Sequence, residues 1–209
     1  MVIDTHVHTK PLSADSTLDP EAAIREAKEI GLDGICFTEH NRAWPREEIA
    51  RLSEKWEFLV LSGVEVDTAE GHVLVFGLHR DFDRVVRAAK LRDMVEAVGG
   101  FMVAAHPFKG FRVFGFSELN LSPEQGSQRP IFRSVDALEG FSGKTIEKES
   151  LMAEEVARIL DMKMTGGSDA HSVEGVGNSA TFFERAIRDE AGLIEELRAG
   201  RFRAGHFRK

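Results

Sequence analysis

The chain contains eight histidines, and five of them fall where predicted strands end. His6 and His8 follow the first predicted strand, while His40, His106 and His171 follow three later ones. In parallel α/β barrels, the C-terminal strand ends and the loops after them build the active site. Neutral imidazole is the commonest side-chain ligand for metal ions. The placement of these histidines therefore predicts a metal centre at one end of a barrel.

Local spacing strengthens this prediction. Asp4, His6 and His8 alternate along the chain, so all three side chains share one face of an extended segment. Asp169 and His171 repeat the same spacing. Because two imidazoles on one face can chelate one metal ion, we expect both segments to contribute ligands.

Further candidate ligands are carboxylates and one more histidine. Asp15 lies in a predicted loop, Glu39 precedes His40, and Glu65 follows the third predicted strand. His72 stands at the start of a predicted strand rather than at its end, and it remains a candidate ligand. Histidine combined with carboxylate suits zinc, manganese or iron.

Short apolar runs alternate with amphipathic segments and supply the elements that would position these residues. Seven strands are predicted, at residues 2–3, 34–38, 58–61, 72–76, 101–105, 135–139 and 163–166, and residues 179–183 could add an extended segment. Helices are predicted at residues 20–30, 46–55, 81–98, 146–160 and 189–199. Such alternation implies parallel pairing through right-handed crossovers. We expect an α/β fold, a single domain over residues 1–209 built as an incomplete TIM-like barrel, with an open doubly wound sheet as the alternative.

One long segment, residues 109–134, interrupts the alternation with glycines, prolines and serines. A loop of that length inside a compact domain is usually functional or disordered. Its aromatic residues Phe111, Phe114 and Phe116 follow Phe108. They either pack against the barrel rim or form a wall beside the site on which a nucleotide base could stack.

Composition excludes several classes of protein. Hydrophobic residues make up 42% and charged residues 30%, which is a globular balance, and no apolar run approaches a membrane span of about 20 residues. The net charge of −8 disfavours binding to long nucleic acid or to a membrane surface. The first residues lack the basic and apolar stretches of a signal peptide, so we expect a cytoplasmic protein. The single cysteine, Cys36, excludes a multi-cysteine metal site, and His79 and His206 are expected to be ordinary polar residues.

Five short motifs occur in the order found in a known family. They are Asp4-Thr5-His6-Val7-His8, Thr38-Glu39-His40, Gly63-Val64-Glu65, Ala105-His106-Pro107 and Ser168-Asp169-Ala170-His171. Together they resemble the PHP superfamily, the polymerase and histidinol phosphatase domains, over nearly the whole chain. The resemblance implies a distorted seven-stranded (β/α) barrel. It also implies a metal-dependent phosphoesterase with two or three divalent metal ions (Mn, Zn or Fe).

The resemblance further implies which residues hold each metal ion. The first ion would be held by His6, His8, Glu65 and Asp169, the second by Glu65, His72 and His106, and the third by Asp15, His40 and His171. Asp4 and Glu39 would orient the histidines, with Glu39 standing where the family usually has aspartate. A metal-bound hydroxide held by Glu65, His6, His8 and Asp169 would be the nucleophile.

Charge favours a phosphate substrate for such a site. Three divalent ions outweigh the three ligand carboxylates, and a phosphomonoester dianion would balance the remaining positive charge. Arg42 and Lys109 closely follow His40 and His106 and could bind the phosphate oxygens. We expect hydrolysis of a small phosphomonoester such as a nucleotide or a nucleoside bisphosphate. The alternatives are a 5′-acting exonuclease, a histidinol-phosphate phosphatase and a metal-binding regulatory module without catalytic activity.

Overall fold

The structure, a computed structural model, describes residues 1–109 and 121–208, so Phe111, Phe114 and Phe116 lie outside the described residues. The strands are β1 (Val2–Val7), β2 (Gly34–His40), β3 (Leu59–Thr68), β4 (Gly71–Phe76), β5 (Phe101–Ala104), β6 (Ala137–Ser142), β7 (Lys163–Gly167), β8 (Ser179–Phe183) and β9 (Phe202–His206). The helices are α1 (Pro20–Glu29), α2 (Arg46–Trp56), α3 (Ala88–Ala97), α4 (Pro123–Ser127), α5 (Glu147–Leu160) and α6 (Glu190–Arg198), with short 3-10 helices η1 (Pro130–Arg133) and η2 (Val173–Gly175).

Within the described ranges, nine strands rather than the expected seven form one sheet, in the order β7-β6-β5-β4-β3-β2-β1-β8-β9. The α/β class is confirmed, but the pairing is not parallel throughout. β1, β2 and β3 are mutually parallel, as are β5, β6 and β7, whereas β4, β8 and β9 run antiparallel to their neighbours. Only Ala69 and Glu70 join β3 to β4, and a link this short cannot make the crossover that parallel strands need.

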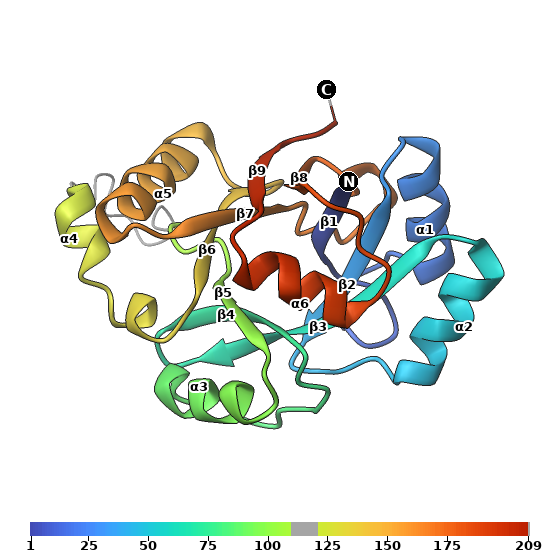
Figure 1. Cartoon of the computed structure of the whole chain (residues 1–209), viewed down its shortest axis with the longest axis horizontal. Coiled ribbons are helices and arrows are strands. Elements are labelled where there is room, and N and C mark those ends of the chain that lie inside the picture. The colour runs from blue at the N-terminus through green and yellow to red at the C-terminus, as the bar shows by residue number, and fades with distance from the viewer. Residues whose placement is uncertain (110–120, 209) are drawn as a thin grey trace.

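The sheet curls until its two end strands, β7 and β9, meet beside β1 (Figure 1). The first residues of β1 pair with β8. Further along β1, the segment that follows β7 takes the place of β8. There the Asp169 N–H donates to the His6 carbonyl oxygen at 2.8 Å, and the His8 N–H donates to the Ala170 carbonyl oxygen at 2.9 Å. The barrel therefore closes at the end where the parallel strands finish.

Apolar side chains fill the barrel and cover its outside. Inside, Leu74 and Phe76 of β4 belong to one buried cluster with Leu193 and Leu197 of α6. α6 lies at the end of the barrel where β1 begins, because β8 leads into it from that end. Outside, α1 and α2 pack on β1–β3, while α3 and α5 pack on β4–β6 (Figure 1). Since α6 covers one end, the end where the parallel strands finish is the one left for a site.

Part of the segment predicted as one long loop has regular structure. α4 is capped by Ser122, which exchanges hydrogen bonds with Gln125, and η1 follows α4 after two residues. Five residues are too few to show helical periodicity in a sequence. The helix predicted from residue 81 begins only at Ala88.

Candidate metal centre

The candidate ligands gather at the end of the barrel opposite α6. His40 is the last residue of β2 and lies directly beside Glu65 of β3 in the register of that parallel pair. His72 was the exception in the sequence pattern, and the strand direction explains it. Because β4 runs antiparallel, the start of β4 lies at the same rim as the ends of the parallel strands. His72 therefore faces the same site, with Asp67 of β3 beside it.

A first group of side chains surrounds the end of β1. The Nε2 atoms of His6 and His8 lie 2.9 Å apart. Asp169 Oδ1 lies 3.4 Å from His8 Nε2 and 3.8 Å from His6 Nε2. Each of the three residues offers one ligand atom, and these atoms all lie within 4.8 Å of one another.

Glu65 connects this group to a second one. Its Oε2 atom lies 3.2 Å from His8 Nε2, while its Oε1 atom lies 3.0 Å from His72 Nδ1 and 3.0 Å from His106 Nε2. The two carboxylate oxygens thus face different histidines. This arrangement matches that of a carboxylate bridging two cations.

A third group lies nearer to solvent. Asp15 Oδ2 lies 3.3 Å from His40 Nε2 and 3.1 Å from His171 Nε2. His8, His40 and His171 also offer ligand atoms within 4.8 Å of one another. The structure therefore brings all nine candidate ligands together in one continuous cluster.

The donor set fits divalent cations. Glu65 is fully buried, and none of the described residues makes a hydrogen bond to its Oε2 atom. Imidazole nitrogens of His40, His8 and His6 nevertheless lie 2.9, 3.2 and 3.6 Å from that atom. A buried carboxylate oxygen without a hydrogen bond is costly unless a cation neutralises it. Converging nitrogen and oxygen donors of this kind suit zinc, manganese or iron.

The groups of the centre shift one another's pKa values. Burial acts to raise the pKa of Glu65, but the charge of His6 and the contacts with His106 and His40 hold that pKa well below its usual value. Burial acts to lower the pKa of His6, yet the carboxylates of Glu139 and Glu65 raise it well above the usual value. Protons and cations therefore compete for the same imidazole nitrogens.

Asp4 and Glu39, the two residues expected to orient histidines, have different kinds of partner. Asp4 contacts no imidazole among the described residues; it accepts hydrogen bonds from the backbone N–H groups of Ser168 at 2.8 Å and Gly177 at 2.9 Å. It thus fixes the segment that carries Asp169. Glu39 accepts a hydrogen bond from the Ser13 hydroxyl at 2.5 Å, and that hydroxyl lies 3.3 Å from His8 Nδ1.

Glu139 is a residue of the site that the sequence analysis missed. Its Oε1 atom accepts a hydrogen bond from His6 Nδ1 at 2.9 Å, and its Oε2 atom accepts one from the His106 backbone N–H at 2.9 Å. His106 has a backbone φ of 27°, which a non-glycine residue adopts only when its surroundings enforce it. Glu139 ends the predicted strand 135–139, just as other candidate ligands end or follow their strands, and this position was the available signal.

The two expected phosphate-binding cations point to different partners. Lys109 Nζ lies 2.5 Å from Asp169 Oδ2, within the centre. Arg42 instead pairs with Asp83 at 2.9 Å and with Asp81 at 3.4 Å, in an exposed position. Of the two, only Lys109 reaches the cluster of candidate ligands.

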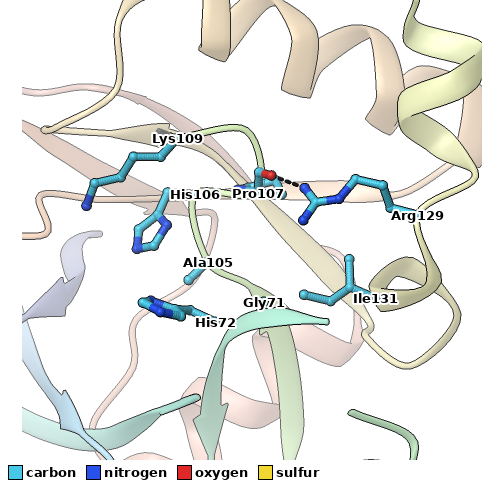
Figure 2. Close-up of a pocket in the computed structure, with 8 residues that line it drawn as sticks. All are labelled: Gly71, His72, Ala105, His106, Pro107, Lys109, Arg129 and Ile131. Carbon is cyan, nitrogen blue, oxygen red and sulfur yellow. Dashed lines mark hydrogen bonds between the residues drawn. The ribbon is translucent and has the colours of Figure 1, made fainter. Parts of the chain in front are cut away.

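A pocket of about 440 Å³ opens beside the second group of ligands. Figure 2 shows His72, His106 and Lys109 on one side of it and Arg129 on the other. The Arg129 guanidinium donates a hydrogen bond to the Pro107 carbonyl oxygen. The pocket thus joins cationic walls to the ligand cluster.

Comparison with known proteins identifies the family. A family model for the PHP domain matches residues 4–172, and one described as PHP-associated matches residues 148–202. This chain belongs to the PHP domain family. The matched PHP domain contains all nine candidate ligands. No helix of the described residues is long and apolar enough to cross a membrane.

Known proteins resemble this PHP domain in sequence or in fold. An uncharacterised protein of Methanocaldococcus jannaschii is 26% identical over 117 residues, which span 52% of this chain and 68% of that protein. The structure of a Bifidobacterium adolescentis protein described as a metal-dependent phosphoesterase superposes with a TM-score of 0.66 at 18% identity, covering 93% of this chain and 95% of that one. A Chromobacterium violaceum amidohydrolase superposes with a TM-score of 0.67 at 14% identity, covering 99% and 98%.

Proposed function

We propose that this PHP-domain protein is a metal-dependent phosphoesterase that hydrolyses a small phosphomonoester, such as a nucleotide or a nucleoside bisphosphate. The observation that carries the proposal is the cluster of ligand-type side chains beside a pocket lined by Lys109 and Arg129. Membership of the PHP family supports a hydrolase. The B. adolescentis protein of similar fold, described as a metal-dependent phosphoesterase, agrees with this chemistry.

Two or three divalent cations would be held by the three groups of side chains. His6, His8, Glu65 and Asp169 would hold the first, Glu65, His72 and His106 the second, and Asp15, His40 and His171 the third. When bound, such cations activate water at neutral pH and neutralise charge on the phosphate.

The surrounding residues of the chain orient these ligands. Glu139 accepts a hydrogen bond from the Nδ1–H group of His6, so that the Nε2 lone pair of His6 points to the centre. Glu39 holds Ser13 against His8, which fixes the ring of His8 in the same way. Lys109 supplies a positive charge beside Asp169, where a phosphate oxygen could be bound.

The pocket beside the second group would take the leaving group of the ester. Its volume of about 440 Å³ lies within the range of small-molecule sites. Pro107 and Ile131 give it apolar surface, while Lys109 and Arg129 give it positive charge. This combination suits a leaving group with an apolar body and an anionic substituent.

A second candidate is cleavage of a phosphodiester at a 5′ end. A separate pocket of about 570 Å³ borders the third group at Asp15 and His40. A substrate with groups on both sides of the phosphate could use both pockets. The same experiment separates the two candidates.

The test is metal analysis of the purified protein followed by a phosphate-release panel with added Mn²⁺, Zn²⁺ or Fe²⁺. The panel contains nucleoside 3′,5′-bisphosphates, histidinol phosphate, an aryl phosphate and short oligonucleotides. We expect turnover of a monoester that a chelator abolishes. His6→Ala should remove metal and activity, whereas the exposed His206→Ala should change neither.

Turnover of oligonucleotides alone would favour the phosphodiester candidate. If the protein binds metal but hydrolyses no member of the panel, releasing neither phosphate nor nucleotides, the regulatory module replaces the enzyme. Histidinol phosphate as the best substrate would replace the nucleotide assignment while leaving the phosphoesterase standing.

A further inference from the structure

A lysine that follows β6 contacts the centre in addition to Lys109. Lys144 lies in a tight turn in which the Thr145 N–H and hydroxyl both donate to the Ser142 carbonyl oxygen, at 3.1 and 2.8 Å. The turn packs directly on the segment after β7. A Cβ atom on Gly143 would lie 2.4 Å from the Ser168 carbonyl oxygen, so only glycine allows this approach. The backbone thus holds Lys144 beside the segment that carries Asp169 and His171.

The Lys144 ammonium contacts two candidate ligands. Its Nζ atom lies 2.7 Å from His171 Nδ1 and 3.9 Å from Asp169 Oδ1. On the other oxygen of the same carboxylate, Lys109 Nζ lies 2.5 Å from Asp169 Oδ2. Two ammonium groups from the loops after β5 and β6 therefore flank one carboxylate of the centre.

Metal ligation would remove both partners of Lys144. His171 directs Nε2 toward Asp15 at 3.1 Å, and its Nδ1 atom lies 2.9 Å from the Asp169 carbonyl oxygen. To ligate through Nε2, the ring must carry its proton on Nδ1, and that proton is then donated to this carbonyl oxygen. Nδ1 would have no lone pair left for Lys144, and Asp169 Oδ1 faces His6 and His8 within the first group.

We propose that Lys144 is a substrate-binding residue that, together with Lys109, binds the phosphate group of the substrate on the Asp169 side of the centre. This inference rests on the proposed phosphoesterase function. An ammonium next to several cations and without its former partners needs an anion, and lysine is a common point-charge ligand for phosphate. The turn holds its backbone in place, so binding requires only a rotation of the side chain.

The competing explanation is that the ammonium replaces a cation. Lys144 would then neutralise Asp169 and His171 permanently, and the centre would hold fewer metal ions. The two explanations differ in what removal of the ammonium does. Loss of a phosphate ligand weakens phosphate binding and leaves metal content unchanged, whereas loss of a built-in cation raises metal content.

The experiment compares Lys144→Ala and Lys144→Arg with the matched control Lys148→Ala. Lys148 is an exposed lysine in α5, and the structure gives it no contact with the centre. Titration calorimetry of the Mn²⁺-loaded proteins with inorganic phosphate gives the dissociation constant without turnover. Steady-state kinetics give KM and kcat for the best monoester, and elemental analysis gives metal per chain.

We expect Lys144→Ala to weaken phosphate binding and raise KM by about 10- to 100-fold, the usual loss for one hydrogen bond to a charged group. Lys144→Arg should retain most of the binding, and Lys148→Ala all of it, with unchanged metal content throughout. An unchanged phosphate dissociation constant in Lys144→Ala, or an increase in its metal content, overturns the proposal, as does a wild-type protein that binds no phosphate. Absence of ester hydrolysis by the wild type would instead refute the phosphoesterase function, and the phosphate titration would still decide the role of Lys144.

Discussion

Replacement of Glu139 by glutamine tests how the centre is held together. Glu139 is 1% exposed and uses its two oxygens for two different donors, His6 Nδ1 and the His106 backbone N–H, both at 2.9 Å. Glutamine has nearly the same shape but offers one oxygen and one NH₂ group. One of the two donors must then face the NH₂ group. If this is His6, its Nδ1 atom must become the acceptor, and the proton moves to the Nε2 atom that the metal ion requires.

The magnitude follows from the one donor left without an acceptor. A buried hydrogen-bonding group in that state costs about 1–3 kcal/mol, which corresponds to about a 5- to 150-fold loss of affinity. Mutation of a residue that hydrogen-bonds to a histidine ligand commonly lowers metal affinity or activity by about 10- to 100-fold. We therefore expect Glu139→Gln to weaken Mn²⁺ or Zn²⁺ binding by about one to two orders of magnitude, with a similar loss of kcat/KM.

Competition titration with a chromogenic chelator measures the affinity, and circular dichroism checks that the variant is folded. The exposed Glu147→Gln on α5 makes the same chemical change away from the centre and should behave as wild type. A folded Glu139→Gln protein with metal affinity within twofold of wild type would refute the reasoning, because Glu139 would then not set the proton position on His6.

Three further predictions concern pH and the rim of the barrel. Burial raises the pKa of Asp4 from 3.8 to about 6, so its contribution to the free energy of unfolding should fall by at most about 3 kcal/mol as pH rises from about 4 to about 6. Denaturant unfolding across this range should show that the difference in free energy of unfolding between wild type and Asp4→Asn declines with pH. A difference that does not change with pH would contradict the prediction. Because nearby carboxylates raise the pKa of His6 despite its burial, metal affinity should rise with pH by about tenfold per pH unit for each proton displaced. Competition with a chelator between pH 6 and 9 measures this dependence. An affinity that does not change with pH would be evidence against the prediction. Arg129 donates hydrogen bonds to the carbonyl oxygen of Pro107 and, at 3.5 Å, to that of Glu70, and these bonds connect the segments that carry two candidate ligands. Arg129→Met should therefore lower the free energy of unfolding by about 1–3 kcal/mol. An unchanged denaturation midpoint would show that the fold does not need this connection.

Histidine spacing located the candidate centre because strand ends recur at one rim of an α/β barrel. The direction of β4 was not visible in the same way. Glu65 and Asp67 lie within β3 but face the centre, and their polarity hides the second half of that strand from a search for apolar runs. The predicted third strand therefore ended at residue 61, so the short connection between β3 and β4 was not visible in the sequence. The polar residues of the site thus made the antiparallel pair of β3 and β4, which positions His72, unrecognisable in the sequence.

Glu139 and Lys144 were missed for a different reason. Glutamate and lysine are common surface residues, and their types carry no signal comparable to a histidine pair. Glu139 becomes recognisable only when His6 lies against it, and Lys144 only when Gly143 allows its turn to approach the segment after β7. Both contacts join separate elements of the fold, so residue type alone could not reveal them, and the one local signal was the position of Glu139 at the end of its predicted strand.

The seam between β1 and the segment after β7 also determines when the centre can form during synthesis. Asp4 accepts its hydrogen bond from Ser168 across 164 positions of the sequence. Contacts so distant in sequence close the largest loops and are among the slowest to form. A ribosome must therefore release the chain beyond Asp169 before His6 and His8 can meet that residue. Until then, a growing chain exposes the histidines of its first strands without their carboxylate partner, and tight capture of a cation is delayed until the barrel is complete.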